Sequence, residues 1–316
     1  MQLSILIPAY NEVESLPHLL EEIRVVCERE KIEYEVLVMD DGSTDGTFDK
    51  AREISAKDNR IHALRFRRNS GKAAALAEGF RRVRGRYVIT MDADLQDNPS
   101  EIPGLIRMLD EGADLVSGWK KIRHDPWHKT VPSKLFNAVT SAVSGVKLHD
   151  FNCGLKAYRS EVVKSVELYG EFHRYIPMLA HWNGFNHIEE KVVEHRARQF
   201  GHSKYGWARL TNGLFDLVTL VFLHRYTRRP LHLFGLMGLI FAMAGLFVLA
   251  GFGISWAVTG QLHVRPMMLA GAASVIVGIQ FISIGLLGEM LNQRFAPATP
   301  PPIAAVTPGC PAGTGA

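Results

Sequence analysis

The chain has 316 residues, enough for one sizeable core and an appended region. Its formal net charge of +4 is too small to favour a nucleic-acid partner. The three scattered cysteines (Cys27, Cys153 and Cys310) favour a reducing compartment and show no spacing typical of a metal site. Because the N-terminus runs directly into an apolar segment, we expect no signal peptide.

Apolar runs and helical periodicities alternate along residues 1–204. The pattern predicts strands at 3–10, 34–41, 61–66 and 87–94, with helices at 12–29, 44–57 and 71–84 between them. The strands are continuously apolar, which is typical of a parallel sheet that is buried on both faces. We therefore predict an α/β domain with a mostly parallel sheet, whose ligands bind beyond the carboxyl ends of the strands.

All four predicted strands end in polar stretches, namely PAYNE, MDDGSTD, RRNSGK and MDADLQD. In the last stretch, Asp92 and Asp94 stand two residues apart, so they would project to the same side of an extended segment. Such a pair can share a hard divalent cation, Mg²⁺ or Mn²⁺, with Gln96 as a further oxygen ligand. The alternative is an acidic surface turn before a capped helix, but the neighbouring polar strand ends favour the metal site.

Two other strand ends carry candidates for nucleotide binding. Asp40 and Asp41 suit a base edge or ribose hydroxyls, or alternatively they cap the helix that follows. Lys72 stands at a predicted helix start, a place that favours a diphosphate. The pattern of a P-loop is absent.

Taken together, the motifs resemble those of the family 2 glycosyltransferases. The matching stretches are IPAYNE, DDGSTD, NSGK, MDADLQDNP and the R-x-x-G-x-S-K segment from Arg198 to Lys204. Within that family the chain is similar, over about residues 3–294, to the polyprenyl-phosphate glycosyltransferases, such as dolichol-phosphate mannose synthases and undecaprenyl-phosphate glycosyltransferases. The resemblance implies a GT-A fold, an inverting mechanism, a UDP- or GDP-sugar donor and a polyprenyl phosphate acceptor.

The resemblance also implies roles for particular residues. Asp94 and Gln96 match the metal ligands, and Asp92, Asp94 and Asp150 are the catalytic candidates. With Asp41 and Lys72 added from the strand ends, the nucleotide-sugar contacts are Pro8, Tyr10, Glu12, Val38, Asp40, Asp41, Lys72, Asp92, Ala93, Arg198 and Lys204. The candidates for the lipid phosphate are Lys120, Lys129, Ser133 and Arg174.

Two positions depart from the mannose synthases. Trp119 stands near the place of an arginine that binds phosphate, and Lys129 replaces the forked donor of another arginine by a point charge. Arg174 either contacts the lipid phosphate or belongs to a packed helix start.

The acceptor chemistry bears on Asp150. A phosphate monoester has a second pKa of about 6, so at neutral pH it is mostly dianionic and needs no general base. Asp150 is then either a base or a group that positions the sugar. We expect the main difficulty to be charge, which a metal with Arg198 and Lys204 would neutralise at the diphosphate.

Two long apolar runs follow. Residues 231–258 contain no Asp, Glu, Lys or Arg, and residues 266–291 contain only Glu289, whereas a membrane crossing needs roughly 20 residues. We predict a transmembrane hairpin at 230–294, the alternative being a buried helix pair of a soluble protein. Glycines in these runs suit packing within the hairpin or between subunits of a homo-oligomer.

The basic flanks of the hairpin, Arg225, Arg228, Arg229 and Arg294, place both termini and the catalytic domain in the cytoplasm at an inner membrane. Residues 205–229 are predicted as helices at the membrane interface, and 295–316 as a disordered tail. Two rival functions are a processive polysaccharide synthase and a non-catalytic subunit that binds sugar nucleotides. The missing Q-x-x-R-W motif argues against the first, and the intact D-x-D motif argues against the second.

Overall fold

The computed structural model describes residues 1–121, 137, 139–168, 170–196, 216–217, 219–222, 230–260 and 265–295, with the backbone alone for 292–295. The chain divides into two compact units, Met1–Leu217 and Val218–Ala316. The boundaries predicted at 204, 229 and 294 stay predictions. The predicted interface helices lie largely outside the described residues, and the predicted tail lies outside them except for residue 295.

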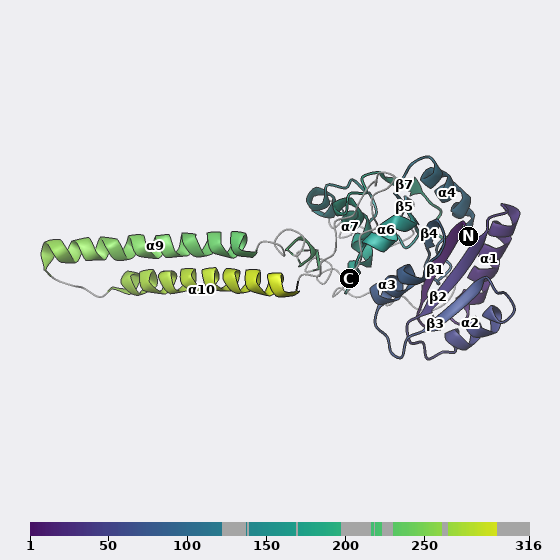
Figure 1. The fold of residues 1–316 in the computed structure, drawn as a ribbon, viewed down its shortest axis with the longest axis horizontal. Helices are drawn as coiled ribbons and strands as arrows, with labels where there is room; N and C mark the ends of the chain where they lie inside the picture. The colour runs from purple at the N-terminus through teal and green to yellow at the C-terminus, as the bar shows by residue number, and fades with distance from the viewer. Residues whose placement is uncertain are drawn as a thin grey trace, which may run out of the picture. The chain divides into compact units, whose positions relative to one another are not determined.

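A sheet of seven strands forms the centre of the first unit (Figure 1). Its order is β3-β2-β1-β4-β6-β5-β7, and among these strands only β6 runs opposite to its neighbours. The predicted α/β class with a mostly parallel sheet is confirmed. The strands are β1 (Leu3–Ala9), β2 (Tyr34–Asp40), β3 (Ile61–Arg65), β4 (Tyr87–Thr90), β5 (Leu115–Trp119), β6 (Lys156–Arg159) and β7 (Ile188–Val192).

Helices cover both faces of this sheet. Side chains of α1 and α4 share one apolar core with Ile5 and Ile7 of β1, whereas α3 packs on Leu6, which points to the other face. The helices of this unit are α1 (Ser15–Arg29), α2 (Thr47–Ser55), α3 (Lys72–Arg82), α4 (Ile102–Asp110), α6 (Ser160–Ser165) and α7 (Ile176–Trp182), with short 3₁₀ turns η1 (Pro99–Glu101) and η2 (Phe172–Tyr175).

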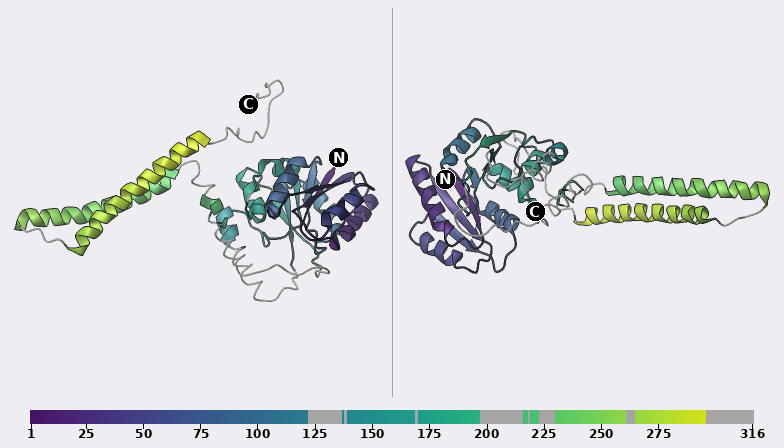
Figure 2. Two further views of the ribbon diagram at one scale, coloured as in Figure 1. Left: turned by 90° about the horizontal axis from the view of Figure 1, so that it is seen from below. Right: turned by 180° about the vertical axis from the view of Figure 1, so that it is seen from behind.

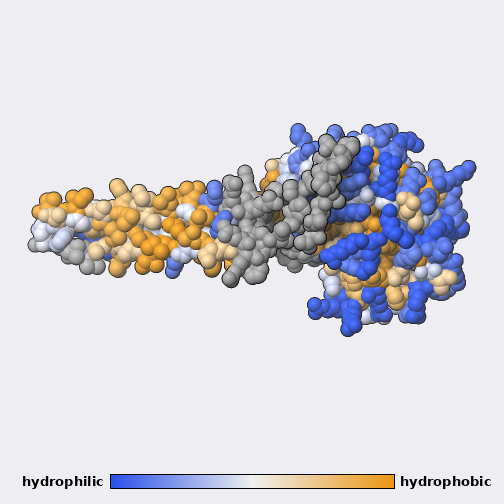
Figure 3. Space-filling model, viewed as in Figure 1, coloured by the Kyte–Doolittle hydropathy of each residue, from blue (hydrophilic) through white to orange (hydrophobic). Residues whose placement is uncertain are grey.

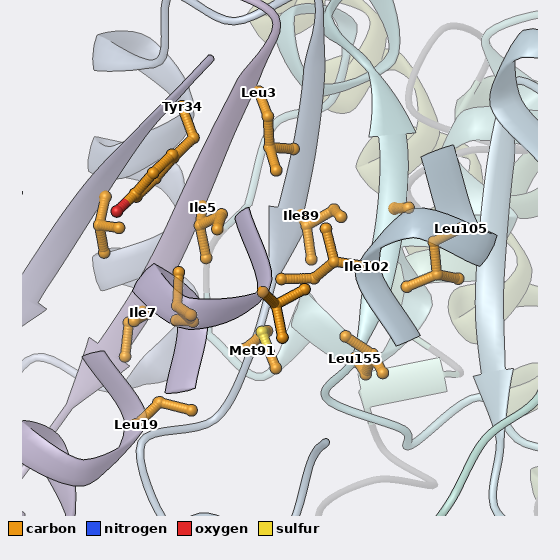
Figure 4. Packing of buried hydrophobic residues seen from close by; sticks show 14 of the residues in the cluster. Leu3, Ile5, Ile7, Leu19, Tyr34, Ile89, Met91, Ile102, Leu105 and Leu155 are labelled. Atoms are coloured by element: carbon orange, nitrogen blue, oxygen red, sulfur yellow. The ribbon is translucent and has the colours of Figure 1, made fainter. Parts of the chain in front are cut away.

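The main core joins strands and helices from distant parts of the chain. Figure 4 shows Ile5 of β1 and Ile89 of β4 gathered with Ile102 of α4, and each of these three side chains is fully buried. Burial of such apolar side chains is the main favourable contribution to folding. The core therefore fixes the relative positions of β1 and β4, and with them the loops that follow these two strands.

A buried carboxylate also ties β1 and β2 to the segment just before β4. Glu35 is 1% exposed, and it accepts hydrogen bonds from Ser4 Oγ at 2.6 Å and from Arg84 N and Nε at 2.9 and 2.8 Å. Burial raises the pKa of the Glu35 carboxyl, but these hydrogen bonds outweigh it and lower the pKa below its ordinary value of 4.5. The charged carboxylate is therefore favoured in the folded state.

This network predicts a pH-dependent contribution to stability. The unfolded chain binds more protons than the folded chain below about pH 4.5, so the contribution of Glu35 is present above that pH and is lost as the pH falls. We expect Glu35→Gln to lower the free energy of unfolding by about 2 kcal/mol at neutral pH. Thermal unfolding of both proteins in detergent should show this difference shrinking at acid pH, and a difference that stays constant would contradict the assignment.

The second unit contains two long helices, α9 (Pro230–Thr259) and α10 (Pro266–Phe295). They lie side by side in Figure 1 and in the right-hand view of Figure 2. Both are long and apolar enough to cross a membrane, and only 11% of each apolar window is buried, which argues against a buried helix pair. In Figure 3 most of the visible hairpin surface is hydrophobic, as expected for helices that contact lipid.

Glycines let the two helices approach closely. A Cβ on Gly238 would lie 2.6 Å from the carbonyl oxygen of Gly278, and one on Gly245 would lie 2.5 Å from that of Gly271. Ser274 Oγ also donates a hydrogen bond of 2.8 Å across the hairpin to the Phe241 carbonyl oxygen. Gly238 and Gly245 therefore serve packing within the hairpin, one of the two alternatives that the sequence left open.

Candidate active site

The polar strand ends meet at one edge of the sheet, as predicted. In the register of the parallel strands, Ala9 of β1 pairs with Asp40 of β2, and Asp40 pairs with Arg65 of β3. Lys156, at the start of the reversed strand β6, pairs with Thr90 at the end of β4. The loops after β1, β2, β3 and β4 and the segment that enters β6 thus share this edge.

The loops after β1 and β2 are tied together by their own polar groups. Asn11 has a left-handed backbone (φ 56°), its N–H donates to Ser43 Oγ at 2.9 Å, and its Oδ1 accepts the Thr44 N–H at 2.9 Å. Glu12 accepts a hydrogen bond from Ser15 Oγ at 2.6 Å. These bonds fix the backbone around Tyr10 and Glu12, two of the predicted nucleotide contacts.

The two aspartates at the end of β2 differ in their contacts. Asp41 accepts the backbone N–H groups of Ser70 at 2.6 Å and Gly71 at 2.8 Å, so its carboxylate holds the loop before α3. Asp40 Oδ2 is buried, lies 3.4 Å from Arg65 Nε, and accepts no hydrogen bond from any described residue. Of the two carboxylates, the one on Asp40 retains acceptor capacity that suits a nucleotide.

The acidic stretch after β4 is a turn and not part of the strand. β4 ends at Thr90 instead of residue 94, and Leu95 adopts a left-handed backbone (φ 61°) inside the turn. The prediction that Asp92 and Asp94 lie in an extended segment and project to the same side of it is therefore wrong. Asp94 is 7% exposed, and its Oδ1 accepts the Gln96 N–H at 3.2 Å, so the turn itself brings these two residues together.

The other two aspartates of the turn, Asp92 and Asp97, each form an ion pair with a lysine. Lys72 Nζ, from the first turn of α3, is bonded to Asp92 Oδ1. Lys120 Nζ, just after β5, lies 2.9 Å from Asp97 Oδ1, and Asp97 Oδ2 accepts the Asp92 N–H at 3.3 Å. Two ammonium groups thus allow the acidic residues to lie close together despite their mutual repulsion.

Protonation states follow from these contacts. Burial raises the pKa of the Asp92 carboxyl, but nearby positive charges, above all that of Lys72, outweigh it and lower the pKa to about 2. His173 of η2 is among those charges. Burial lowers the pKa of the Lys120 ammonium, but Asp97 outweighs it and raises the pKa above its ordinary value. The Asp92 carboxylate and the Lys120 ammonium are therefore charged at neutral pH.

Gly154 packs directly against the carboxylate of Asp92. A Cβ at Gly154 would lie 2.6 Å from Asp92 Cγ, closer than real Cβ atoms approach other atoms. The Gly154 carbonyl oxygen accepts a hydrogen bond of 2.9 Å from Thr90 Oγ1. Asp92 is thus held between Lys72 on one side and the backbone of the segment that enters β6 on the other.

The remaining predicted residues lie around this centre. Asp150 is 1% exposed and accepts the Asn152 N–H at 3.0 Å. The Trp119 ring stacks on His149, with centroids 4.1 Å apart and planes inclined by 12°. Arg174 of η2 is buried, with Nη2 2.8 Å from Glu171 Oε2, and its contact with the lipid phosphate stays a prediction.

Several predictions cannot be placed. Lys129, Ser133, Arg198 and Lys204 lie outside the described residues. Pro8, Val38 and Ala93 lie in β1, in β2 and in the acidic turn, as expected from their positions. The binding roles proposed for all of these residues stay predictions.

The donor set fits a hard divalent cation. Within the described part of the chain, no group of three or more His, Cys, Asp or Glu side chains is placed to hold a metal ion. The predicted set does not require one, since Asp94 and Gln96 supply a carboxylate and an amide oxygen and leave other positions to phosphate oxygens and water. Oxygen ligands of this kind suit Mg²⁺ or Mn²⁺.

The comparison with protein families decides the class. The model of the family named Glycosyl transferase family 2 matches residues 4–166, which span β1 to β6 and the whole acidic turn. The chain belongs to glycosyl transferase family 2. It is a glycosyltransferase, and the predicted resemblance to this family is confirmed.

A relative found by sequence similarity narrows the assignment within the family. The chain is 35% identical, over 93% of its own length and 89% of the relative, to the dodecaprenyl-phosphate galacturonate synthase of Rhizobium johnstonii. The likeness to a polyprenyl-phosphate enzyme, first suggested by the motifs, is thereby confirmed.

Solved structures of glycosyltransferases share the fold. The mannosyl-3-phosphoglycerate synthase of Rubrobacter xylanophilus aligns with a TM-score of 0.58 at 17% identity, covering 70% of this chain and 74% of its own. The glucosyl-3-phosphoglycerate synthase of Mycobacterium tuberculosis, in complex with Mn²⁺, uridine diphosphate and its product, aligns with a TM-score of 0.55 at 21% identity, covering 71% and 79%. At these identities the likeness supports the GT-A fold alone.

Some residues of this glycosyltransferase site could not be assigned from the motifs. The motifs assign no role to Gly154, Lys156, His173 or Glu190. The available signal for Gly154 is its place beside polar residues before a strand, where a glycine indicates a close approach. Nothing in the local sequence connects it with Asp92.

Proposed function

We propose that this glycosyltransferase moves one sugar, a hexose or hexuronic acid, from a nucleoside diphosphate to a polyprenyl phosphate. The observation that carries the proposal is the 35% identity to dodecaprenyl-phosphate galacturonate synthase, which extends over 93% of the chain and so includes the apolar helices. Uridine diphosphate is the first nucleotide to test, since the Mycobacterium tuberculosis structure holds it together with Mn²⁺. Galacturonic acid is the first sugar to test.

The site chemistry supports transfer to a phosphate. A phosphate monoester is mostly dianionic at neutral pH because its second pKa is about 6, so the acceptor needs no base to become a nucleophile. The larger barrier is repulsion between this dianion and the diphosphate of the donor. Lys72 and Lys120 pair with Asp92 and Asp97, so the charges of these two carboxylates add little to the repulsion in the turn where both anions would meet.

Residues of the chain have distinct roles in this proposal. Asp40 and the loops after β1 and β2 bind the nucleoside, and Asp94 with Gln96 holds Mg²⁺ or Mn²⁺. The bound cation supplies positive charge that stabilises the leaving diphosphate. Asp92, fixed by Lys72 and Gly154, orients the sugar so that the phosphate oxygen attacks the anomeric carbon from the side opposite the leaving group.

The apolar helices fit a lipid substrate. A polyprenyl phosphate keeps its head at the membrane interface, and a membrane anchor raises the effective concentration of the catalytic unit there. We propose that α9 and α10 span an inner membrane, with both termini on the cytoplasmic side, as the flanking arginines indicate.

The experiment is a product assay with the purified full chain in detergent. Labelled UDP-galacturonic acid, UDP-glucose and GDP-mannose are each incubated with Mn²⁺ and undecaprenyl phosphate, and the products are separated by thin-layer chromatography. We expect one lipid-linked monosaccharide and no product when undecaprenol lacking the phosphate replaces the acceptor. A polymer, or no lipid product from any donor, would contradict the proposal.

A further inference from the structure

Four polar side chains lie in one row across the sheet. Thr90 of β4 stands opposite Lys156 of β6, Lys156 opposite Ser117 of β5, and Ser117 opposite Glu190 of β7. Residues directly opposite each other on neighbouring strands point to the same face, so these four side chains share one face. We call them the polar row. Burial of polar groups is unfavourable unless they form hydrogen bonds, which raises the question of what the row binds.

Lys156 is the most unusual member of the row. It is 3% exposed, and its ammonium donates to the carbonyl oxygens of Phe151, at 3.1 Å, and of Cys153. Burial lowers the pKa of this ammonium. A buried lysine is rare without partners that satisfy it, and here two backbone carbonyl oxygens of the segment before β6 provide hydrogen bonds.

The two hydroxyl groups of the row extend the same pattern. Thr90 Oγ1 donates to the carbonyl oxygen of Gly154 at 2.9 Å, and Ser117 Oγ donates to that of Asp150 at 3.4 Å. The three donors of the row thus bind carbonyl oxygens at four positions of one short segment, namely residues 150, 151, 153 and 154.

Glu190 completes the pattern with the opposite polarity. Its Oε1 accepts the backbone N–H groups of His149 at 2.7 Å and Asp150 at 3.1 Å, while its Oε2 lies 2.7 Å from His149 Nδ1. Donors of the row therefore lie under carbonyl oxygens, and its one carboxylate lies under N–H groups. The donors and the carboxylate of the row are thus complementary to the carbonyl oxygens and N–H groups that residues 149–154 turn toward the sheet.

The segment held in this way reaches the candidate active site. Gly154, at its end, contacts the Asp92 carboxylate, whose other side is bonded to Lys72. A change in the height of the segment above the sheet would move Gly154 toward or away from Asp92. Lys156 binds the carbonyl oxygens of residues 151 and 153 with a single ammonium group, so its loss would release both of them from the sheet at once.

We propose that Lys156 is a positioning residue for sugar transfer: with the rest of the polar row it fixes residues 149–154 so that Gly154 supports Asp92. The expected effect of Lys156 on the rate rests on the proposed function. Its effect on the position of residues 149–154 rests on geometry alone. Lys156 touches neither donor nor acceptor in this assignment. Its loss therefore lowers the rate of the chemical step more than the affinity for the donor.

The test compares Lys156→Met and Lys156→Arg in the full chain. We expect Lys156→Met to lower kcat by about 100-fold, as a displacement of about 1 Å can, with the KM for the sugar nucleotide changed by less than about twofold. Lys156→Arg retains donors for the two carbonyl oxygens and is expected to recover about tenfold of that loss. Lys57→Met, at an exposed lysine that pairs with Glu53, is the matched control and should behave as the wild type.

A second pair of variants covers the case in which Lys156→Met does not fold. Thr90→Val removes the hydroxyl at nearly constant volume, and Thr90→Ser keeps it. We expect kcat to fall by about tenfold in the valine variant and to stay near the wild type in the serine variant. Equal rates in these two variants, or a kcat for Lys156→Met within about threefold of the wild type, would overturn the inference.

Hydrogen exchange separates this inference from the proposed function. Mass spectrometry of the peptide covering residues 149–154 should show faster amide exchange in Lys156→Met than in Lys57→Met, whatever the substrate. If the wild type transfers no sugar to any polyprenyl phosphate, the proposed function fails, and the exchange data still decide the positioning of the segment. Unchanged exchange in Lys156→Met would overturn it.

Discussion

Replacing Asp94 by alanine is expected to reduce sugar transfer by at least about 1,000-fold, the scale of losing a group that stabilises the charge of a transition state. Asp94 lies in the acidic turn after β4. In the proposed mechanism it is the only charged side chain that binds the cation, whose other charged ligands are oxygens of the leaving diphosphate. Initial rates with UDP-galacturonic acid and undecaprenyl phosphate, measured over a range of Mn²⁺ concentrations, test this expectation. The residual rate of Asp94→Ala should no longer rise with Mn²⁺.

The matched control is Asp49→Ala, which removes an exposed carboxylate from α2 and should leave the rate unchanged. Circular dichroism and thermal unfolding should show that Asp94→Ala remains folded. Wild-type activity in Asp94→Ala would remove the metal assignment from the turn and, with it, the proposed means of neutralising the diphosphate.

The second large effect is expected from Gly154→Ala, which should lower kcat by about 100-fold. The added methyl group would stand 2.6 Å from Asp92 Cγ, so either the carboxylate or the backbone of the segment must move. Movement of the carboxylate would disturb its bond to Lys72, and movement of the segment would strain the bond from Thr90 Oγ1 to the Gly154 carbonyl oxygen. Steady-state kinetics with the active donor measure the loss.

Gly104→Ala in α4 is the control for this substitution. Its new methyl group would meet only the flexible end of the Lys191 side chain, and alanine is the better helix former, so rate and fold should both be retained. If Gly154→Ala were as active as Gly104→Ala, the contact between Gly154 and Asp92 would have no role in transfer.

Much of the first half of the fold could be predicted from the sequence. The strands β1 to β4 are apolar runs with helical periodicities between them, and such local patterns carry their own signal. The strands β6 and β7 carry much weaker signals. β6 has four residues, and β7 reads IEEKV, with charged residues on a partly exposed edge. These strands form because they pair with β4 and β5, which local sequence does not reveal.

The same distinction applies to the site. The convergence of polar strand ends follows from parallel strands, so Asp40, Asp41, Asp92 and Asp94 could be grouped in advance. The partners of these residues could not be predicted. Lys120 was assigned to the lipid phosphate, and in the structure its ammonium is paired with the fully buried Asp97 carboxylate. Gly154 reaches Asp92 through the register of β4 and β6, strands that lie more than 60 residues apart.

The reversed direction of β6 has a consequence for how such enzymes diverge. If β6 were parallel to β4, the segment entering it would start at the opposite edge of the sheet, far from Asp92. Because β6 runs backwards, the segment that enters it lies beside the polar loops after β1 to β4 without belonging to any of them. Substitutions within it can therefore change the surroundings of Asp92 while the loops after β1 to β4 keep their structure, provided that the side chains beneath it continue to match its backbone.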